Sequence, residues 1–359
     1  MNQNIAEAPP VSGAHDAPSQ GRSALTLVAL IVGGIIVLLA SIVAAACIGG
    51  ESISLVNVRD ILSNHLHLTD IRVLPYKEVI VWEDRVPRSV VAAAVGGGLA
   101  ICGVILQSLL RNPLADPFLL GISSGASTGA VVIGILGLGS LAIGLSGGAF
   151  IGALVSFGAV LLLSYLAGGS TDRVILAGIA MTQLFSALTS FVIFAFADSD
   201  ETRGVMFWLL GSLDGVRWND AQLTVVVTVA GLLLCWAAAR ALDAFTFGDE
   251  VASSLGIDVT RVRGALLVLT ALITAALVSV AGAVGFVGLL IPHAARFLVG
   301  PGHVRLLPVS AISGAVFLVW VDAISRQAFH PTPLPLGVGT ALIGVPAFVL
   351  IMFSRRARA

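Results

Sequence analysis

The side chains that could do chemistry are few and scattered along this sequence. Cys47, Cys102 and Cys235 each lie inside an apolar run, with neither paired spacing nor partners at metal-ligand spacing. Cysteines placed in this way are typical of small core residues rather than of redox or metal sites. His65 and His67 stand two residues apart in a polar segment, which is a weak metal spacing, so a solvated loop is the favoured interpretation. The sequence therefore predicts no metal site.

Catalysis and nucleotide binding have no better support. Pro292, His293 and Arg296 lie together, but the chain has no HExxH pattern and no serine–histidine arrangement beside them. Lys77 is the only lysine, and it follows a tyrosine rather than the glycine of a phosphate-binding loop. A net charge of −1 provides no basic field for nucleic acid. We expect no catalytic residues, no cofactor in this chain and no nucleic-acid partner, and any ATP must bind to another chain.

The elements that carry these residues are expected to be membrane helices. Hydrophobic residues make up 57% of the 359 residues, charged residues only 11%, and the mean hydropathy is +1.02. Soluble domains carry about a quarter charged residues. With about 20 residues a span, the length allows roughly ten to twelve helices, and the 40 glycines suit close helix packing. The expected fold class is an all-α polytopic membrane protein with about ten transmembrane helices.

Apolar runs divide the chain into spans. Residues 1–23 are polar and rich in Pro, Ala and Ser, so we expect a disordered tail before a transmembrane domain over 24–355. Residues 49–84 are expected to form a mostly polar loop, and 205–215 a short re-entrant or interfacial helix. The expected spans cover residues 24–48, 88–110, 118–137, 141–166, 173–197, 220–240, 264–281, 284–299, 305–325 and 335–353.

Ten spans place both termini on the same side of the membrane. With the termini inside, eleven basic residues fall on inner segments and eight on outer segments. This mild preference strengthens once the long 49–84 loop is discounted, because charge in longer loops counts less. We therefore expect both termini, and the polar stretch 243–263, on the cytoplasmic side.

The stretch 243–263 is patterned for a short helix that stops at a glycine, with a second helix starting in 257–262. From the pattern alone, a compact docking site for a partner and an ordinary polar loop are equally favoured. The first helix and its stop comprise Asp249, Glu250, Ala252, Leu255 and Gly256.

Three arginines are expected at the outer ends of spans. Arg85 and Arg88 precede the second span, and Arg326 follows Asp322 by four residues at the end of the ninth. Exposed arginines attract an acidic partner over long range and pair with it bidentately. The structural alternatives are interface anchoring for Arg85 and Arg88 and an i,i+4 pair between Arg326 and Asp322.

A double-proline turn joins the second and third expected spans. Pro113 and Pro117 forbid one continuous helix, and Asn112 and Asp116 can cap the incoming helix. A fixed turn is therefore favoured over direct contact with a substrate.

Polar and small residues also occur at membrane depth. Gln107 and Gln183 are expected to make interhelical hydrogen bonds, because polar groups there face the bundle or a cavity. For Ser124 and Gly125, in a run of small residues, a place on a translocation path is not separable from helix packing.

These motifs resemble the signature of the iron-chelate and vitamin B12 permease family (FecCD/BtuC type), the membrane subunits of ATP-driven importers. The resemblance covers roughly residues 25–353. Its most specific pieces lie at 85–88, 103–107, 111–117, 121–126, 248–256, 285–296 and 334–346.

The resemblance implies a BtuC-like bundle that forms a homodimer around a central path in the cell membrane. Two ATPase subunits, which bind ATP and Mg²⁺, would dock at the 243–263 loops, where Gly248 joins the coupling residues. A periplasmic or lipid-anchored substrate-binding protein would meet Arg85, Arg88 and Arg326. A ferric siderophore is the first hypothesis for the substrate, and haem and cobalamin importers share the same motifs.

An ion-coupled secondary carrier is the competing class of function. Such a carrier needs buried carboxylates or histidines that bind protons or sodium. Asp322 and His293 are the near candidates, and both are expected close to span ends. A carrier works alone, whereas an importer permease requires ATPase and binding-protein partners.

Overall fold

The computed structural model describes residues 20–137, 144–328 and 332–356, and within these ranges the chain is helical and contains no strand. Seven helical segments there are long and apolar enough to cross a membrane. They are α1 (Gln20–Cys47), the continuous α3–η1–α4 segment (Pro75–Leu109), α6 (Gly144–Leu166), α7 (Thr171–Phe196), α9 (Trp218–Ala237), α12 (Val259–Ala281) and α14 (His303–Ala328).

Three shorter apolar helices bring the set within the described ranges to ten. They are α5 (Ile122–Ile135), α13 (Val287–Val299) and α15 (Leu336–Arg356). The expected fold class and the expected number of spans are therefore confirmed. Each of these helices overlaps one of the ten apolar runs, because the length of an apolar run sets the length of a membrane helix.

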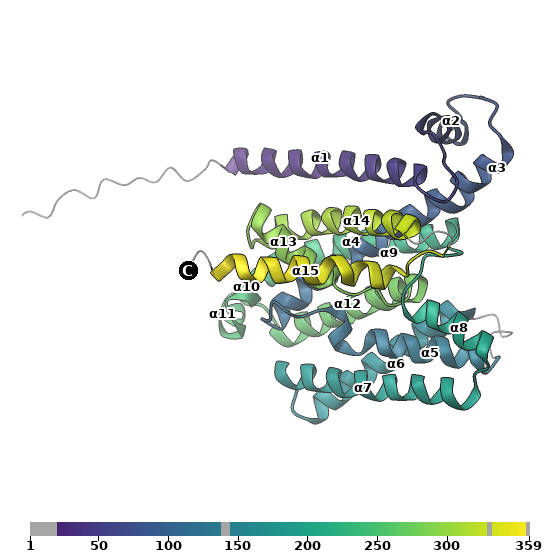
Figure 1. Ribbon diagram of the computed structural model, residues 1–359. Helices are drawn as coiled ribbons and strands as arrows, with labels where there is room; N and C mark the ends of the chain where they lie inside the picture. The colour runs from purple at the N-terminus through teal and green to yellow at the C-terminus, as the bar shows by residue number, and fades with distance from the viewer. Residues whose placement is uncertain (1–19, 138–143, 329–331, 357–359) are drawn as a thin grey trace, which may run out of the picture.

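The remaining short helices lie at the two ends of the bundle. They are α2 (Leu55–His65), η2 (Pro117–Leu120), α8 (Ser199–Leu209), α10 (Ala239–Thr246) and α11 (Asp249–Ser254). Figure 1 shows α10 and α11 at the end where α1 starts and α15 finishes, with α2, α3 and α8 at the opposite end. We call these the inner and outer ends of the bundle. Both described chain ends therefore lie at the inner end.

Residues 49–84 differ from the expected polar loop. Ser54 caps α2, accepting a hydrogen bond from the Asn57 backbone N–H, and the buried Val58 and Ile61 pack against a helix that starts at Pro75. That helix runs through a π-helical turn, η1 (Val79–Arg85), directly into α4 (Val86–Leu109). The second span thus begins well before the expected residue 88.

Two further boundaries differ from expectation. Residues 1–19 of the expected tail lie outside the described residues, and α1 already begins at Gln20. The expected second short helix in 257–262 is the first turn of the spanning helix α12, capped by Asp258. An additional helix, α10, precedes the glycine at position 248. Hydropathy locates a span well but not the turn that leads into it.

Helix α4 is the centre of the molecule and is buried along nearly its whole length. Glycines allow its backbone to approach two neighbours closely. A Cβ on Gly96 would lie 2.2 Å from the Gly314 carbonyl oxygen of α14, and one on Gly103 would lie 1.9 Å from the Gly288 carbonyl oxygen of α13. Such contacts exclude any side chain, so the glycine-rich run of α4 is explained by helix packing. Helices α1 and α7 lie at opposite edges of the bundle (Figure 1).

Candidate functional site

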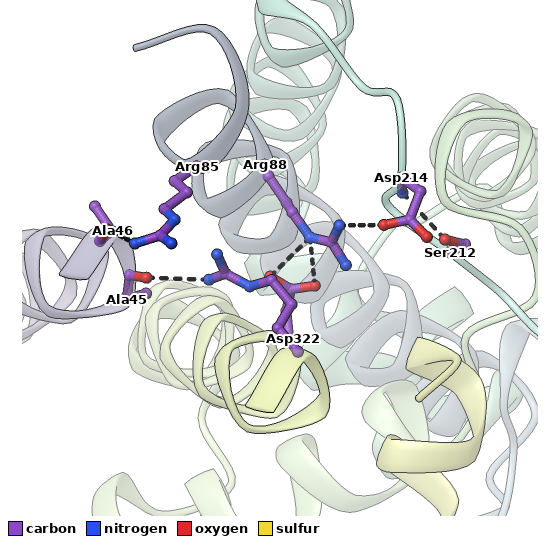
Figure 2. Close-up of polar contacts among 8 residues, drawn as sticks. Ala45, Ala46, Arg85, Arg88, Ser212, Asp214 and Asp322 are labelled. Carbon is purple, nitrogen blue, oxygen red and sulfur yellow. Dashed lines mark hydrogen bonds and ion pairs between the residues drawn. The ribbon is translucent and has the colours of Figure 1, made fainter. Parts of the chain in front are cut away.

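The outer end of the bundle holds a buried ionic network (Figure 2). Arg88 of α4 donates from Nε to Asp322 Oδ1 of α14 at 2.9 Å and from Nη1 to Asp214 in the loop between α8 and α9. Arg326 forms an ion pair with Asp322 at 3.2 Å and donates to the Ala45 carbonyl oxygen of α1 at 3.1 Å. Asp322 thus bridges two arginines, and the network joins three helices and one loop.

Arg85 anchors the same region to the end of α1. Its Nη1 and Nη2 atoms donate to the carbonyl oxygens of Ala46 at 3.0 Å and Glu51 at 2.6 Å. Figure 2 shows Arg85 and Arg88 reaching in different directions from α4. The guanidinium of Arg85 occupies the space next to Gly49, where a Cβ would lie 2.5 Å from Nη2. These contacts fix the turn that follows α1.

The expectation that these three arginines are exposed is wrong for the subunit alone. Arg85 is 4% exposed and Arg88 7% exposed, and the side chain of Arg326 is 9% exposed. For Arg85 and Arg88 the physical reason is that their helix continues past them to Pro75, which places them inside the protein. Arg326 is covered by the end of α1, where it donates to Ala45. Acidic and carbonyl oxygens satisfy the charge of all three. The i,i+4 pair between Arg326 and Asp322, the structural alternative, is present.

The inner end of α4 is held by Gln107. Its Nε2 donates to the Gly288 carbonyl oxygen of α13 at 3.1 Å, the interhelical hydrogen bond that the sequence predicts. Its Oε1 accepts a hydrogen bond from Arg296 Nη1 at 2.5 Å. Gln183, in contrast, lies on an exposed face of α7.

The double-proline turn after α4 is fixed by its own side chains. Asn112 Oδ1 accepts from the Leu114 backbone N–H at 2.9 Å, and Asp116 Oδ1 accepts from the Phe118 N–H at 2.9 Å, where it caps η2. The second oxygen of Asp116 is buried and has no hydrogen-bond partner. Burial raises the pKa of Asp116 to about 6. Pro117 packs beside this carboxyl group, next to Gly288.

Ser124 and Gly125, in α5, contribute to packing in the single subunit. Ser124 Oγ donates to the Gly121 carbonyl oxygen one turn earlier at 3.0 Å. A Cβ on Gly125 would lie 2.3 Å from the Ser156 Cβ and 2.4 Å from the Gly152 carbonyl oxygen of α6. The backbones of α5 and α6 are therefore in contact at Gly125, and Pro113 lies apart from them in the turn after α4.

The inner segment 248–256 has a defined geometry. Gly248 has φ of +110°, which a side chain would strain, and α11 follows it. Asp249 Oδ1 accepts from Arg263 Nη2 at 2.6 Å, and this hydrogen bond lowers the pKa of Asp249. Ala252 is fully buried, and Gly256 has φ of +81° just after the helix, so it ends the helix as the sequence predicts.

The surface of this segment is apolar around one carboxylate. Glu250 is exposed, and beside it Phe247 is 77%, Leu255 67% and Val251 42% exposed. Large apolar side chains gathered at a helix surface mark contact with a partner or with lipid. Here they lie on a short helix at the inner end of the bundle, linked by Asp249 to the start of α12.

Sequence reasoning missed one polar relay at the inner end. His303, the first residue of α14, is 1% exposed and lies between Ser108 and Asp243. Its Nε2 is 2.5 Å from Ser108 Oγ, and its Nδ1 is 2.6 Å from Asp243 Oδ1. These three residues are far apart in the chain and belong to no recognised pattern. Asp214 of the outer network was missed for the same reason.

The described part of the chain contains no candidate metal centre. Among the described residues, no three His, Cys, Asp or Glu side chains come together in a group that could hold a metal ion. Cys47, Cys102 and Cys235 are free thiols, and the last two are buried. His65 stacks on Trp82 with ring centroids 3.9 Å apart and pairs with Glu78 at 3.0 Å.

Comparison with known proteins decides between the classes of function left open by this geometry. The FecCD transport family matches residues 21–354. The chain belongs to this family. A relative in Halobacterium salinarum, a cobalamin import system permease protein BtuC, is 43% identical over 79% of this chain and 75% of its own length. A vitamin B12 import system permease protein BtuC of Escherichia coli is 36% identical over 79% and 86%.

Two further similar proteins widen the comparison. An uncharacterised ABC transporter permease protein of Bacillus subtilis, YvrB, is 41% identical over 76% of this chain and 78% of its own length. A solved inward-facing structure, assigned to the metal-chelate type of ABC transporter, is 28% identical. The superposition covers 90% of this chain and 99% of the chain in that structure, with a TM-score of 0.78. This FecCD protein is therefore a multi-pass membrane permease of an ABC importer and not an enzyme.

Proposed function

We propose that this FecCD permease imports cobalamin or a closely related corrinoid. The observation that carries the proposal is the similarity to relatives named as cobalamin or vitamin B12 permeases, at 43% and 36% identity over at least three quarters of each chain. A ferric siderophore, the first hypothesis from the sequence, is the second candidate. It is favoured by the likeness to a metal-chelate type transporter structure at 28% identity.

The proposed working unit is a homodimer in the cell membrane with both termini in the cytoplasm. Its support includes α7, where Gln183, Ser186 and Ser190 repeat at helical spacing on an exposed face. Polar groups at membrane depth normally face protein or a water-filled cavity. A second copy of the chain, and a path between the two copies, would keep this face of α7 away from lipid.

Two ATPase subunits are proposed to bind at α11. The apolar side chains of Phe247, Val251 and Leu255 surround Glu250 there, which suits a partner that buries apolar area and meets a carboxylate. Because Asp249 is hydrogen-bonded to Arg263, force applied to α11 would act directly on the first turns of α12. ATP and Mg²⁺ would bind to these partners.

The substrate-binding protein is proposed to dock at the outer end. The three arginines expected to receive it are held inside the subunit, and only Asp214, with a side chain 53% exposed, brings their network to the surface. Arg326→Gln tests the docking role, because glutamine preserves most of the volume without the charge. If the variant binds the substrate-binding protein more weakly than the unchanged permease does at low ionic strength, docking through this charge is supported. Unchanged association places docking elsewhere on the outer surface.

The substrate is tested by reconstituting the permease in liposomes with its ATPase and binding protein. We expect cyanocobalamin-loaded binding protein to stimulate ATP hydrolysis and cobalamin uptake. Stimulation by a ferric hydroxamate or by haem instead would refute cobalamin and retain the importer.

Glu250→Arg is the test variant for coupling, and Asp172→Arg is its matched control. Asp172 is an exposed carboxylate in the first turn of α7, on a different helix from α11. We expect Glu250→Arg to abolish stimulated ATP hydrolysis and co-purification of the ATPase, with the control unaffected. Equal behaviour of the two variants would remove α11 from the docking site.

A further inference from the structure

A cavity of about 290 Å³ opens at the inner end of the bundle, between α4, α10, α13 and α14. Four basic side chains line it, two arginines and two histidines, together with hydroxyl groups. None of its lining residues, all of them in the described part of the chain, is acidic. The polar lining includes Arg111, His293, Arg296, His303, Ser108 and Thr246.

The protein holds two of the basic groups in fixed positions. Arg296 donates from Nη1 to Gln107 Oε1 at 2.5 Å, and Gln107 is itself anchored to the Gly288 carbonyl oxygen on α13. His303 is 1% exposed and is held from both ring nitrogens by Ser108 and Asp243. A polar wall built in this way loses little conformational entropy when it receives a ligand.

Both ring nitrogens of His303 are engaged by the protein. Nδ1 faces Asp243 Oδ1, and Nε2 shares a hydrogen bond with Ser108 Oγ. The Ser108 hydroxyl also lies 3.0 Å from the Val104 carbonyl oxygen. The carboxylate of Asp243 binds the ring from the side of α10, and its side chain is 40% exposed. His303 is therefore a fixed polar part of the cavity wall.

Arg111 completes the cavity from the turn after α4. It has φ of +48°, a left-handed conformation that is uncommon for a residue with a side chain. Its Nη1 lies 3.5 Å from the position that a Cβ on Gly248 would take, so its guanidinium lies beside the segment between α10 and α11. Arg111 is exposed. It can therefore meet a ligand that enters from the aqueous side.

We propose that this cavity binds a phosphate group. Guanidinium groups present planar pairs of N–H donors that match phosphate oxygens, and Arg111 and Arg296 both line the cavity. The volume is at the lower limit of small-molecule sites, which suits one phosphate group and little more. The phosphate would come from free inorganic phosphate or from the headgroup of an anionic lipid. This site is independent of the transported substrate.

The test uses the full-length permease in two settings. Calorimetry in detergent with inorganic phosphate and pyrophosphate measures free phosphate, and native mass spectrometry from phosphatidylcholine nanodiscs with and without phosphatidylglycerol measures retained lipid. Arg111→Gln and Arg296→Gln are the test variants. Arg305→Gln is the matched control, because Arg305 is an exposed arginine close to His303 that does not line the cavity.

We expect either the free phosphates or phosphatidylglycerol to bind and Arg111→Gln to weaken that binding about tenfold, as the loss of a single charge-assisted contact predicts. Because Arg111 is exposed, this variant is expected to fold even if Arg296→Gln does not. Binding of inorganic phosphate identifies the free ion, and loss of retained phosphatidylglycerol alone identifies the lipid. The proposal is overturned if neither ligand binds, or if Arg305→Gln weakens binding as much as Arg111→Gln.

Discussion

Asp322→Asn tests the outer network, because it removes one negative charge and almost no volume. In the structure Asp322 is 1% exposed and compensates Arg88 and Arg326, whose side chains are 8% and 9% exposed. Removing one partner from a buried ion pair costs about 3–5 kcal/mol, because the remaining charge stays buried. We expect Asp322→Asn to lower stability by that amount.

Asp214→Asn is the matched control, with the same change in chemistry at the other end of Arg88. The side chain of Asp214 is 53% exposed, so solvent screens its ion pair. Exposed pairs contribute about 0–1 kcal/mol. If burial determines the energy of these ion pairs, Asp322→Asn should lower the free energy of unfolding several times more than Asp214→Asn does.

The assay is the apparent melting temperature of the purified permease, followed by intrinsic fluorescence at a fixed heating rate. A loss of about 3 kcal/mol corresponds to a fall of roughly 5 °C or more, and the control to less than about 2 °C. Arg326→Met in the Asp322→Asn background should recover part of the loss, because it removes an uncompensated cation. An equal effect of both asparagine variants, or a further loss in the double variant, would refute the reasoning.

Three other expectations follow from the geometry. Gly103→Leu should prevent the permease from eluting as a monodisperse species in size-exclusion chromatography, because even a Cβ would lie 1.9 Å from the Gly288 carbonyl oxygen. Gly158→Leu is the control and should elute normally, because a Cβ on Gly158 would meet no atom within 4 Å. Asp116→Asn should raise stability at pH 7 by up to about 3 kcal/mol, because the folded-state pKa of about 6 means that ionisation above pH 4–6 destabilises the native state; a stability that still falls over this pH range in the variant would contradict this. The lowered pKa of Asp249 stabilises α11 above the unfolded pKa of about 4, and this stabilisation is lost as pH falls below it. The protection factors for hydrogen exchange in 249–254, which are corrected for the intrinsic exchange rate, should therefore fall in acid, and Asp249→Asn should abolish that pH dependence.

The spans were predictable because hydropathy acts locally. Each apolar run has to bury its backbone polar groups in a helix. Even α13, with Pro292 inside it, keeps its helix over Val287–Val299. The stop at Gly256 and the cap at Asp116 were equally local, since each depends on a residue's own backbone or on a neighbour two positions away.

The polar networks were not predictable because their partners are distant in sequence. Arg88 meets Asp214 and Asp322 from 126 and 234 positions away, and only the Arg326–Asp322 pair has a helical spacing that the sequence displays. Read alone, Arg88 at the end of an apolar run resembles an exposed interface arginine. The relay from Ser108 to His303 spans 195 positions and has the same difficulty.

Helix α12 connects the inner segment to the outer network by direct contact. At its inner end Arg263 holds Asp249 of α11, and at its outer end the Ala281 carbonyl oxygen accepts from the Ser212 N–H at 3.0 Å. Ser212 Oγ in turn accepts from the backbone N–H of Asp214, whose carboxylate binds Arg88.

A helix of 23 residues is about 35 Å long and behaves as one rigid element. Any displacement of α11 that carries α12 along its axis must therefore either move the 212–214 loop or break the Ser212–Ala281 hydrogen bond. The half-exposed Asp214 is the weakest ionic contact of the outer network. We therefore expect the ion pair between Arg88 and Asp214 to break first, while the buried ion pairs of Asp322 are kept.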